Sequence, residues 1–337
     1  MLGLTPPSPK SACATTCGDT RTPPRMDDDI AAKVAQHPCY NAKAHLNFAR
    51  MHVPVAPACN IQCNYCNRKY DCSNESRPGV TSTRLTPEQA ADKVLMVAAR
   101  MPQLSVVGIA GPGDPLAKPA VLFETLERIR QKLPSIMPCV STNGLVLADH
   151  VDTLKELGVE HVTITINATA PDVAAQIYPW VYFEGKRHSG REGAAILLER
   201  QMEGLRACVA AGILVKVNSV MIPGINDQHL EDVNKAITAA GAFMHNIMPL
   251  ISDPSHGTWF GLNGQREPTA EELEDLRERC DGPVKLMRHC RRCRADAIGF
   301  LGEDKHAEFA SSTSMSVEEM EARLQRREKY LRYQRSA

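Results

Sequence analysis

The sequence predicts an α/β protein, a partial (β/α)6 barrel of the TIM type with extensions at both ends. From Met51 onward, apolar β-branched runs alternate six times with amphipathic helical stretches. The interiors of the apolar runs are almost continuously hydrophobic, as in parallel strands whose two faces are both covered. A chain of 337 residues with 43% hydrophobic residues is long enough to bury such a core.

The expected elements follow one another in the order strand, helix, strand. Strands are expected at residues 51–57, 105–111, 137–142, 161–167, 214–221 and 243–251. Helices are expected at residues 86–100, 121–133, 148–157, 194–211, 227–240 and 269–279. The first helix opens with a capping box, Thr86 with Gln89. Gly158, Gly212 and Gly241 follow three of the helices at the C-cap position.

Composition divides the chain into three segments. Residues 1–36 are rich in Pro, Thr, Ser and Asp without an apolar period, which predicts a mostly disordered tail. Cys13 and Cys17 in this tail are interpreted as incidental rather than as a metal site. Residues 37–310 form the expected barrel with its extensions. Residues 311–337 are expected to form a charged helix, at about 316–335, whose charges make a solvated face.

Charge and hydropathy exclude several classes of partner. The 39 basic and 39 acidic residues cancel, so no global field favours nucleic acid. No apolar run approaches the roughly 20 residues that span a bilayer, and the N-terminus lacks the order of a secretory signal. We therefore expect a cytoplasmic protein without a membrane partner. Twelve cysteines in that reducing compartment indicate metal or redox chemistry rather than disulfides.

Three cysteines, Cys59-x-x-x-Cys63-x-x-Cys66, follow the first strand. They are expected at the C-terminal ends of the barrel strands, where active sites of parallel α/β barrels lie. Three thiolates fill three corners of a 4Fe-4S cluster and leave one iron open. The amino and carboxylate groups of S-adenosylmethionine (SAM) can chelate such an iron. A zinc knuckle is the alternative, but it needs a nearby fourth ligand, and Cys290-x-x-Cys293 is distant in the sequence.

With Tyr65 before its last cysteine, this motif resembles the radical SAM signature. The stretches HPCYNAKAHLNFARMHVPVAPACNIQCNYCNRKYDCSNESRPGV, GIAGPGDPL and RHCRRCRADAIGFLGED resemble the NifB family of nitrogenase cofactor biosynthesis enzymes, from about His37 to Glu308. The resemblance implies a barrel of the radical SAM type. It also implies an enzyme that fuses two 4Fe-4S clusters with an added sulfur. A carbide from a SAM methyl group completes the 8Fe core.

Two auxiliary 4Fe-4S clusters would need ligands beyond the signature. The cysteines available for them are Cys39, Cys72, Cys139, Cys290 and Cys293. Cys139 lies within a strand, where a cysteine is often a small buried hydrophobe. Because five thiolates cannot saturate two clusters, we expect a histidine ligand or a shared sulfur. His52 on the first strand is the first candidate, followed by His45 and His37, and hydrogen-bonded core or surface histidines are the alternative.

Polar and glycine residues at the strand ends are candidate SAM contacts. Gly111, Gly113 and Asp114 in GPGDP replace the common Gly-Gly-Glu form and suit the SAM ammonium, with a tight turn as the alternative. Contacts to the SAM carboxylate and ribose are expected from polar residues after or on the next three strands. They are Ser141, Thr142, Asn143, Asn167 and Asn218, with capping or turn roles as the alternative.

Glu75 and Asn74 are the candidate catalytic residues. Carbide formation requires proton removal from a methyl group, and a carboxylate at Glu75 suits that task. A salt bridge between Glu75 and Arg77 is the alternative. Arg291, Arg292 and Arg294 either guide an anionic cluster or solvate a loop.

The implied partners are iron-sulfur cluster donor proteins, a low-potential electron donor and a carrier or maturation scaffold of nitrogenase. The sequence ends at Ala337 without the small carrier-like domain of some NifB members, so we expect hand-off to a separate protein. Two other functions stay open: a radical SAM enzyme like molybdenum cofactor synthase, and a non-catalytic iron-sulfur scaffold.

Overall fold

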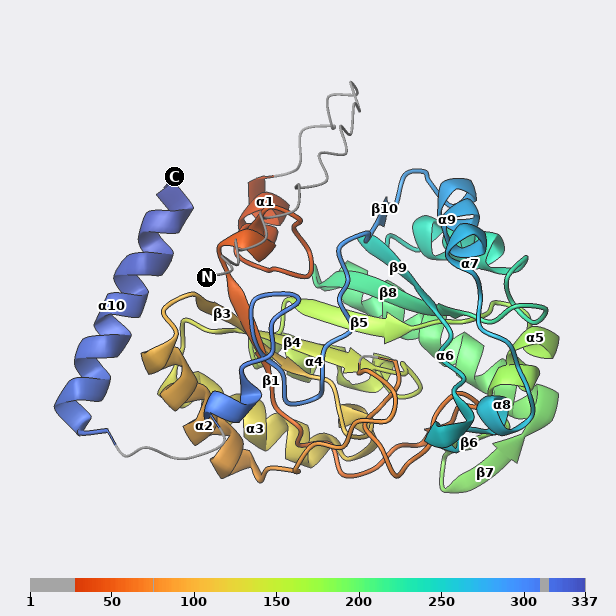
Figure 1. Cartoon of the computed structure of the whole chain (residues 1–337), viewed down its shortest axis with the longest axis horizontal. Coiled ribbons are helices and arrows are strands. Elements are labelled where there is room, and N and C mark those ends of the chain that lie inside the picture. Colours follow the sequence, from red (N-terminus) through yellow and green to blue (C-terminus); the bar gives the residue numbers. More distant parts are fainter. Residues whose placement is uncertain (1–27, 75, 310–314, 337) are drawn as a thin grey trace, which may run out of the picture.

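The computed structural model describes residues 28–74, 76–309 and 315–336 (Figure 1). Among these residues an eight-stranded sheet runs in the order β10-β9-β8-β5-β4-β3-β1-β11. All six expected strands are present in it. They are β1 (Ala49–His52), β3 (Leu104–Ile109), β4 (Met137–Thr142), β5 (His161–Thr165), β8 (Leu214–Met221) and β9 (Met244–Pro249). These six pair in parallel, which confirms the predicted α/β barrel sheet.

Two short strands that the sequence did not predict extend the sheet at its edges. β10 (Lys285–Leu286) pairs in parallel with β9, and β11 (Ile298–Gly299) pairs antiparallel with β1. Because β11 follows the Cys290 and Cys293 loop, its pairing brings that loop across the edge of the sheet next to β1. The sheet has β10 at one edge and β11 at the other, and these two strands do not pair with each other. The barrel is therefore open, as expected for a partial barrel.

The expected helices follow the strands along the chain (Figure 1). They are α2 (Pro87–Arg100), α3 (Pro119–Lys132), α4 (Val151–Glu156) with η3 (Ala148–His150) before it, α6 (Gly190–Ala210), α7 (Leu230–Ala239) and α9 (Ala270–Arg279). The capping box is present at α2: Gln89 N donates to Thr86 Oγ1 at 3.2 Å, and Thr86 N donates to Gln89 Oε1 at 2.9 Å. Boundaries agree with expectation to within three or four residues.

A small three-stranded sheet, also not predicted, braces the loop that carries the three-cysteine motif. It consists of β2 (Ile61–Gln62) and the hairpin β6 (Trp180–Phe183) and β7 (Lys186–Ser189), which follows α5 (Pro171–Ile177). Ile61 pairs with Val181, and Tyr182 N donates to Asn60 O at 2.6 Å. The backbone of this loop is thus held by sheet hydrogen bonds.

The remaining short elements lie in loops. They are η1 (Ala44–Leu46), η2 (Pro115–Ala117), η4 (Pro254–His256), η5 (His306–Phe309) and α8 (Trp259–Leu262). Among the described residues, no helix has both the length and the apolar character that crossing a membrane demands.

The N-terminal segment is more ordered than the sequence predicted. Residues 28–36 belong to the expected disordered tail, yet Asp28–Val34 form helix α1 and Val34 is buried against Tyr40 and Leu214. Apolar contact with Leu214, the first residue of β8, offsets the entropy cost of ordering this segment. The composition of the segment gave no sign of that contact. Residues 1–27, with Cys13 and Cys17, lie outside the described residues.

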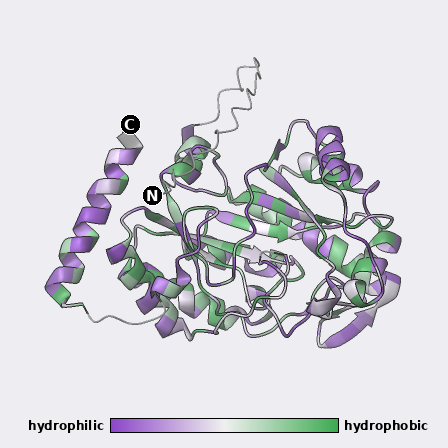
Figure 2. Cartoon of the chain, in the orientation of Figure 1, coloured by the Kyte–Doolittle hydropathy of each residue, from purple (hydrophilic) through white to green (hydrophobic). Residues whose placement is uncertain are grey.

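The C-terminal helix α10 (Val317–Ser336) is mostly hydrophilic, as expected (Figure 2). Its charges are nevertheless not all solvated. Arg327 has no exposed side-chain surface and donates to Leu104 O at 3.0 Å and to Ser135 Oγ at 2.7 Å. Gln36 Nε2 donates to Leu331 O at 2.8 Å. α10 is therefore attached to the rest of the protein by the buried Arg327 and by contacts of Leu331, which is buried against Ala44 and Phe48.

Replacing that arginine is expected to destabilise the protein. Arg327→Ala removes buried hydrogen bonds from a charged donor, which costs about 2–3 kcal/mol of unfolding free energy. Urea denaturation measures the change. Arg326→Ala, at the exposed neighbouring position, is the control and is expected to leave the midpoint unchanged. Equal midpoints for both variants would contradict a structural role for Arg327.

Candidate functional site

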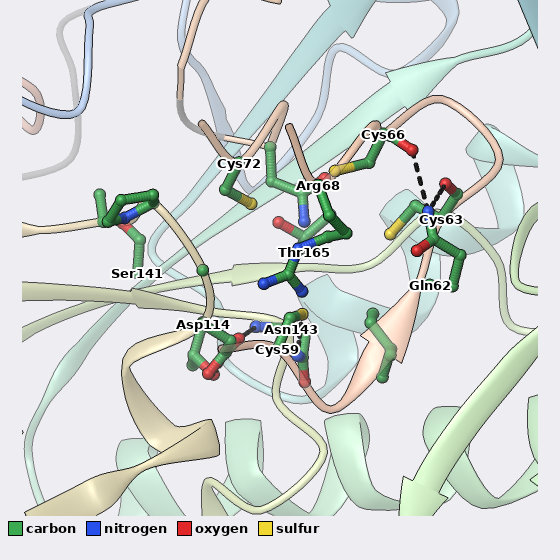
Figure 3. A pocket seen from close by; sticks show the side chains of 16 residues that line it. Cys59, Gln62, Cys63, Cys66, Arg68, Cys72, Asp114, Ser141, Asn143 and Thr165 are labelled. Atoms are coloured by element: carbon green, nitrogen blue, oxygen red, sulfur yellow. Dashed lines mark hydrogen bonds between the residues drawn. The ribbon is translucent and has the colours of Figure 1, made fainter. Parts of the chain in front are cut away.

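A pocket opens at the C-terminal ends of β3, β4 and β5, where the loops after these strands meet the loop after β1 (Figure 3). Its lining contains many of the residues expected from the sequence. They are Cys59, Cys63, Cys66, Cys72, Asn74, Gly113, Asp114, Ser141, Thr142 and Asn143. Gln62, Arg68 and Thr165 line it as well and were not predicted. Figure 3 shows the guanidinium of Arg68 pointing into the pocket.

The loop with the three cysteines is folded by its own hydrogen bonds. Cys66 N donates to Cys63 O at 3.0 Å. The Gln62 side chain donates from Nε2 to Cys63 O and Cys66 O, both at 2.9 Å (Figure 3). One glutamine amide therefore satisfies two carbonyls of the loop and leaves the thiols turned toward the pocket.

The thiols of this loop suit a cationic partner. Burial, together with the nearby Asp114, raises the pKa of Cys59 to about 12, and burial raises the pKa of Cys63 well above its usual value. Buried thiolates need a metal or another cation to be stable. In the described part of the chain, no three His, Cys, Asp or Glu side chains meet closely enough for a single ion. Three cysteines with the spacing Cys-x-x-x-Cys-x-x-Cys line this one pocket, and such a set suits three corners of a 4Fe-4S cluster.

The GPGDP loop packs backbone to backbone against the residues before Cys59. Gly113 N donates to Ala56 O at 3.0 Å, and Asp114 N donates to Ala58 O at 2.7 Å. A Cβ added at Gly113 would lie 1.9 Å from Ala58 O. Glycine at position 113 is therefore required for this close approach. Gly111 lies outside the pocket, and its carbonyl accepts from Ala56 N at 3.0 Å.

The carboxylate of Asp114 holds the neighbouring loops together. It accepts from Leu116 N at 2.9 Å, from Thr142 Oγ1 at 3.0 Å and from Asn143 N at 2.5 Å. These internal contacts occupy both oxygens of a buried side chain, so Asp114 is a positioning group in this conformation. A direct contact between Asp114 and the SAM ammonium stays a prediction.

Asn143 faces the three-cysteine loop directly. Its Nδ2 donates to Asn60 Oδ1 at 2.7 Å and lies 3.8 Å from Cys59 Sγ. The Asp114 carboxylate fixes the position of Asn143 by accepting from its backbone N–H. The end of β4 therefore supplies a polar group aimed at the first cysteine.

Two of the expected SAM contacts lie outside the pocket lining. Asn167 donates from Nδ2 to the hydroxyls of Tyr65 at 2.7 Å and Tyr178 at 2.8 Å. Asn218 donates from Nδ2 to Asn74 O at 3.1 Å. Both side chains hold residues that are in, or adjacent to, the lining.

The two residues expected to act in catalysis lie in the segment after the signature. Asn74 lines the pocket and accepts from the Tyr65 hydroxyl at 2.7 Å. Glu75 lies outside the described residues. Cys72 shares the pocket with the three signature cysteines, whereas the sequence suggested that it faces one cavity with Cys39 and Cys139, which line the other cavity.

A second, smaller cavity adjoins the first, and Ala110 and Ser141 line both. Four residues expected as ligands or ligand candidates, His37, Cys39, His52 and Cys139, are distributed around it. Its lining is His37, Cys39, Arg50, His52, Val106, Gly108, Ala110, Cys139, Ser141, Thr163 and Lys216. The fold therefore brings the segment before β1, strand β1 itself and strand β4 to one space.

The histidines near this cavity differ in what they contact. His52 Nδ1 lies 2.9 Å from Arg294 O, which leaves Nε2 for another partner. Burial, with help from Arg50, lowers the pKa of His52 to about 4, so its ring is neutral, as a metal ligand must be. His37 lines the cavity, and within the described residues its buried Nε2 has no hydrogen-bond partner. His45 lies outside the cavity and stacks on His289.

The Cys290 and Cys293 loop reaches the same region. Arg50, 2% exposed, donates from Nε and Nη2 to Cys293 Sγ at 3.3 and 3.1 Å. Arg77 N donates to Cys293 O at 3.0 Å, which ties the loop to the segment after Cys72. Cys290 packs against the apolar cluster that Cys59 and Cys66 also contact.

The arginines of the Cys290 and Cys293 loop differ from one another. Arg292 donates to Pro249 O, and Arg294 pairs with Asp296 at 2.8 Å. Arg291 is exposed. Arg292 and Arg294 therefore stabilise the loop through a hydrogen bond and an ion pair.

Comparison with known proteins assigns the family. Residues 53–237, more than half of the chain, match the model of the Radical SAM superfamily. The chain belongs to this superfamily. Membership implies a 4Fe-4S cluster and SAM as cofactors, and the three cysteines that line the pocket are the residues that would hold the cluster.

Curated relatives and a solved structure add detail. The chain is 60% identical over 306 residues to the FeMo cofactor biosynthesis protein NifB of Herbaspirillum seropedicae, covering 91% of this chain and 58% of that protein. It is 62% identical over 280 residues to NifB of Klebsiella pneumoniae, covering 83% and 60%. The chain thus spans about 60% of the length of these relatives. The structure of SuiB from Streptococcus suis bound to its precursor peptide covers 77% of this chain and 51% of that chain, with 11% identity and a TM-score of 0.49.

The close contact at Gly113 can be tested in this radical SAM protein. Gly113→Ala forces the GPGDP loop away from Ala58 and is expected to weaken SAM binding by about tenfold, a loss of roughly 1.4 kcal/mol. Equilibrium dialysis of the reconstituted protein with SAM measures the affinity. Gly282→Ala, where an added Cβ meets nothing closer than 4.0 Å, is the control. Wild-type affinity in Gly113→Ala would show that the two loops can separate without consequence.

Proposed function

We propose that this chain is a radical SAM enzyme of nitrogenase cofactor biosynthesis that fuses two 4Fe-4S clusters into an 8Fe core with a SAM-derived carbide and an added sulfur. The observation that carries the proposal is the pair of adjoining cavities, which share Ala110 and Ser141. One cavity has the thiols and polar groups for a SAM-binding cluster. The other has cysteine and histidine side chains for cluster substrates, and the relatives named NifB support this assignment.

In the first cavity, Cys59, Cys63 and Cys66 hold the resident cluster. Bound SAM and this cluster supply a transferable methyl group and a 5′-deoxyadenosyl radical. Backbone groups of Gly113 and the amide of Asn143 orient SAM, with Asp114 keeping both loops in place. Ser141, Thr165 and Arg68 complete the lining, and the guanidinium of Arg68 suits the SAM carboxylate.

In the second cavity, thiolates and one imidazole hold the two cluster substrates. The proposed ligands are Cys39, Cys139 and His52 in the lining of this cavity, Cys72 in the lining of the first, and Cys290 and Cys293 in the loop that contacts Arg50. Cys72 lines the first cavity, so a substrate cluster bound through it lies beside SAM. Arg50 supports the anionic sulfur of Cys293 with two N–H donors, and such hydrogen bonds to a ligand sulfur orient it and tune its cluster.

The reaction proceeds in two SAM-dependent stages. A sulfide of a cluster substrate attacks the methyl group of one SAM, and S-adenosylhomocysteine leaves. The 5′-deoxyadenosyl radical from a second SAM then takes a hydrogen atom from that methyl group. The carbon then loses its two remaining protons to a base, for which Glu75 is the candidate. Its bond to sulfur breaks, and the irons of the cluster substrates supply the electrons that complete the carbide. Asn74, next in the sequence, is held by the Tyr65 hydroxyl.

Such an enzyme requires other proteins. Cluster donors must supply the two substrates, a low-potential donor must reduce the resident cluster, and a carrier or maturation scaffold of nitrogenase must take the product. We propose a cytoplasmic location for this chain, because cysteine thiols stay reduced there and available to iron-sulfur clusters.

The two stages predict two products. Anaerobic incubation of the reconstituted protein with SAM and dithionite is expected to yield both S-adenosylhomocysteine and 5′-deoxyadenosine, separated by chromatography. Cys63→Ala is expected to abolish 5′-deoxyadenosine, whereas Cys280→Ala, buried elsewhere in the core, retains it. 5′-deoxyadenosine alone would refute carbide insertion and leave a generic radical SAM enzyme. The absence of both products would indicate a non-catalytic scaffold.

The ligands of the cluster substrates predict a loss of iron. Cys293→Ala and His52→Ala are each expected to lower bound iron by about four atoms per chain, one 4Fe-4S cluster, while SAM binding persists. Iron analysis and equilibrium dialysis measure the two quantities, and retained SAM binding shows that the barrel is folded. Cys208→Ala, inside helix α6, is the control. Full iron content in His52→Ala would remove His52 from the ligand set.

A further inference from the structure

The second cavity contains a buried lysine that has no part in the reaction proposed above. Lys216 lies within strand β8, is 6% exposed and lines this cavity. Its neighbours in the chain, Val215 and Val217, pack in the hydrophobic core, because successive residues of a strand point to opposite faces. The inward positions of a parallel barrel are mostly filled by bulky aliphatic side chains. A lysine at such a position is therefore a departure that calls for a ligand of matching charge.

Strand register places Lys216 close to the junction of the two cavities. Thr163 of β5 pairs with Ser141 of β4 on one side and with Lys216 of β8 on the other. Ser141 lines both cavities. Two residues further along β8, Asn218 donates to the backbone of Asn74, which lines the SAM pocket. Lys216 thus belongs to the cavity for cluster substrates at the level where that cavity approaches SAM.

The charged side chains in the described lining of the second cavity are both basic, Arg50 and Lys216. They come from β1 and β8, two strands that are not neighbours in the sheet. Arg50 is fixed by hydrogen bonds to Cys293 Sγ and Gly299 O. Lys216 therefore adds a positive charge from a second strand of the cavity wall.

Both charges act on a proposed ligand of the cluster substrate. Burial raises the pKa of the Cys39 thiol to about 12, whereas the positive charges of Lys216 and Arg50 lower that pKa and favour the thiolate. Thiolates and inorganic sulfides make a 4Fe-4S cluster an anion, and its charge and the hydrogen bonds to its sulfurs set its reduction potential. An ammonium is a compact charge with three N–H donors, which suits such an anion. Each added electron makes the cluster more negative, so a nearby positive charge stabilises the reduced state more than the oxidised state.

We propose that Lys216 is a positioning residue for the cluster substrate: its ammonium holds the anionic cluster in the second cavity and favours the reduced state of that cluster. The inference rests on the proposed function and adds a residue that controls its substrate. The irons of the cluster substrates supply the electrons that complete the carbide. A substrate that is kept reduced brings those electrons to the reaction.

The test measures the cluster substrate directly. The full chain with Cys59→Ala, Cys63→Ala and Cys66→Ala is the parent, because its spectra contain no signal from the resident cluster. After anaerobic reconstitution with iron and sulfide, its clusters are titrated with dithionite and followed by electron paramagnetic resonance. Lys216→Met keeps the length of the side chain and removes its charge. At the parent's midpoint potential, this variant is expected to lower the ratio of reduced to oxidised cluster about tenfold, equal to about 59 mV for one electron.

Two further variants separate charge from shape and from position. Lys216→Arg keeps a positive charge and is expected to keep the parent's midpoint potential. Lys285→Met removes an exposed ammonium from β10 of the same sheet, outside the cavity, and is also expected to keep it. With the signature cysteines intact, Lys216→Met is expected to bind SAM as the wild type does in equilibrium dialysis, which shows that the barrel is folded.

The outcomes distinguish this proposal from the proposed function. Loss of about four iron atoms per chain in Lys216→Met but not in Lys216→Arg would also support it, because the charge would then retain the cluster. An unchanged midpoint in Lys216→Met, an equal shift in Lys285→Met, or the same loss in both Lys216 variants would overturn it. Bound clusters without both SAM-derived products would refute carbide insertion, and the midpoint potentials would still test Lys216. A parent chain that binds no cluster would overturn both proposals.

Discussion

The close backbone contact between residues 56–58 and the GPGDP loop is the constraint on which the site depends. It aligns two loops that follow neighbouring parallel strands, and Gly113 permits it because no side chain intervenes. Asp114 extends the contact to a third loop through Thr142 and the backbone of Asn143. Three strand ends are thereby locked in one geometry, and the thiols of the signature loop take their positions from it.

The same geometry explains why two cavities adjoin. Parallel strands present their C-terminal ends at one edge, so loops far apart in sequence converge there. The segment before β1 and the loop before β11 then approach from the other side, where Arg50 meets Cys293. Ser141 lines both cavities, so the proposed cluster substrate in one would lie beside SAM in the other. A reaction in which SAM acts on an iron-sulfur substrate needs this proximity.

The signature loop is also supported from outside. The hairpin of β6 and β7 adds strands to β2, and α8 packs on the loop from the far side. This support was not predictable because β2 has two residues and pairs with residues more than 100 positions away. Neither local propensity nor periodicity carries such a signal. Likewise, Arg327 looks like one of many charges on α10, and only its contacts with Leu104 and Ser135 distinguish it from Arg326.

What the sequence determined by itself is local or periodic. Buried parallel strands need continuous apolar runs, so six strands and their helices were predictable, and the spacing of Cys59, Cys63 and Cys66 is a short-range motif within one loop. The tertiary structure decided which distant residues meet. It brought Cys72 to the signature pocket and grouped Cys39, His52 and Cys139 around a second cavity. It also placed Asn167 and Asn218 behind the pocket lining, where they donate to Tyr65 and Asn74. The physical reason is that such meetings depend on the register of strands and the paths of loops, which packing of the whole chain sets and no single segment encodes.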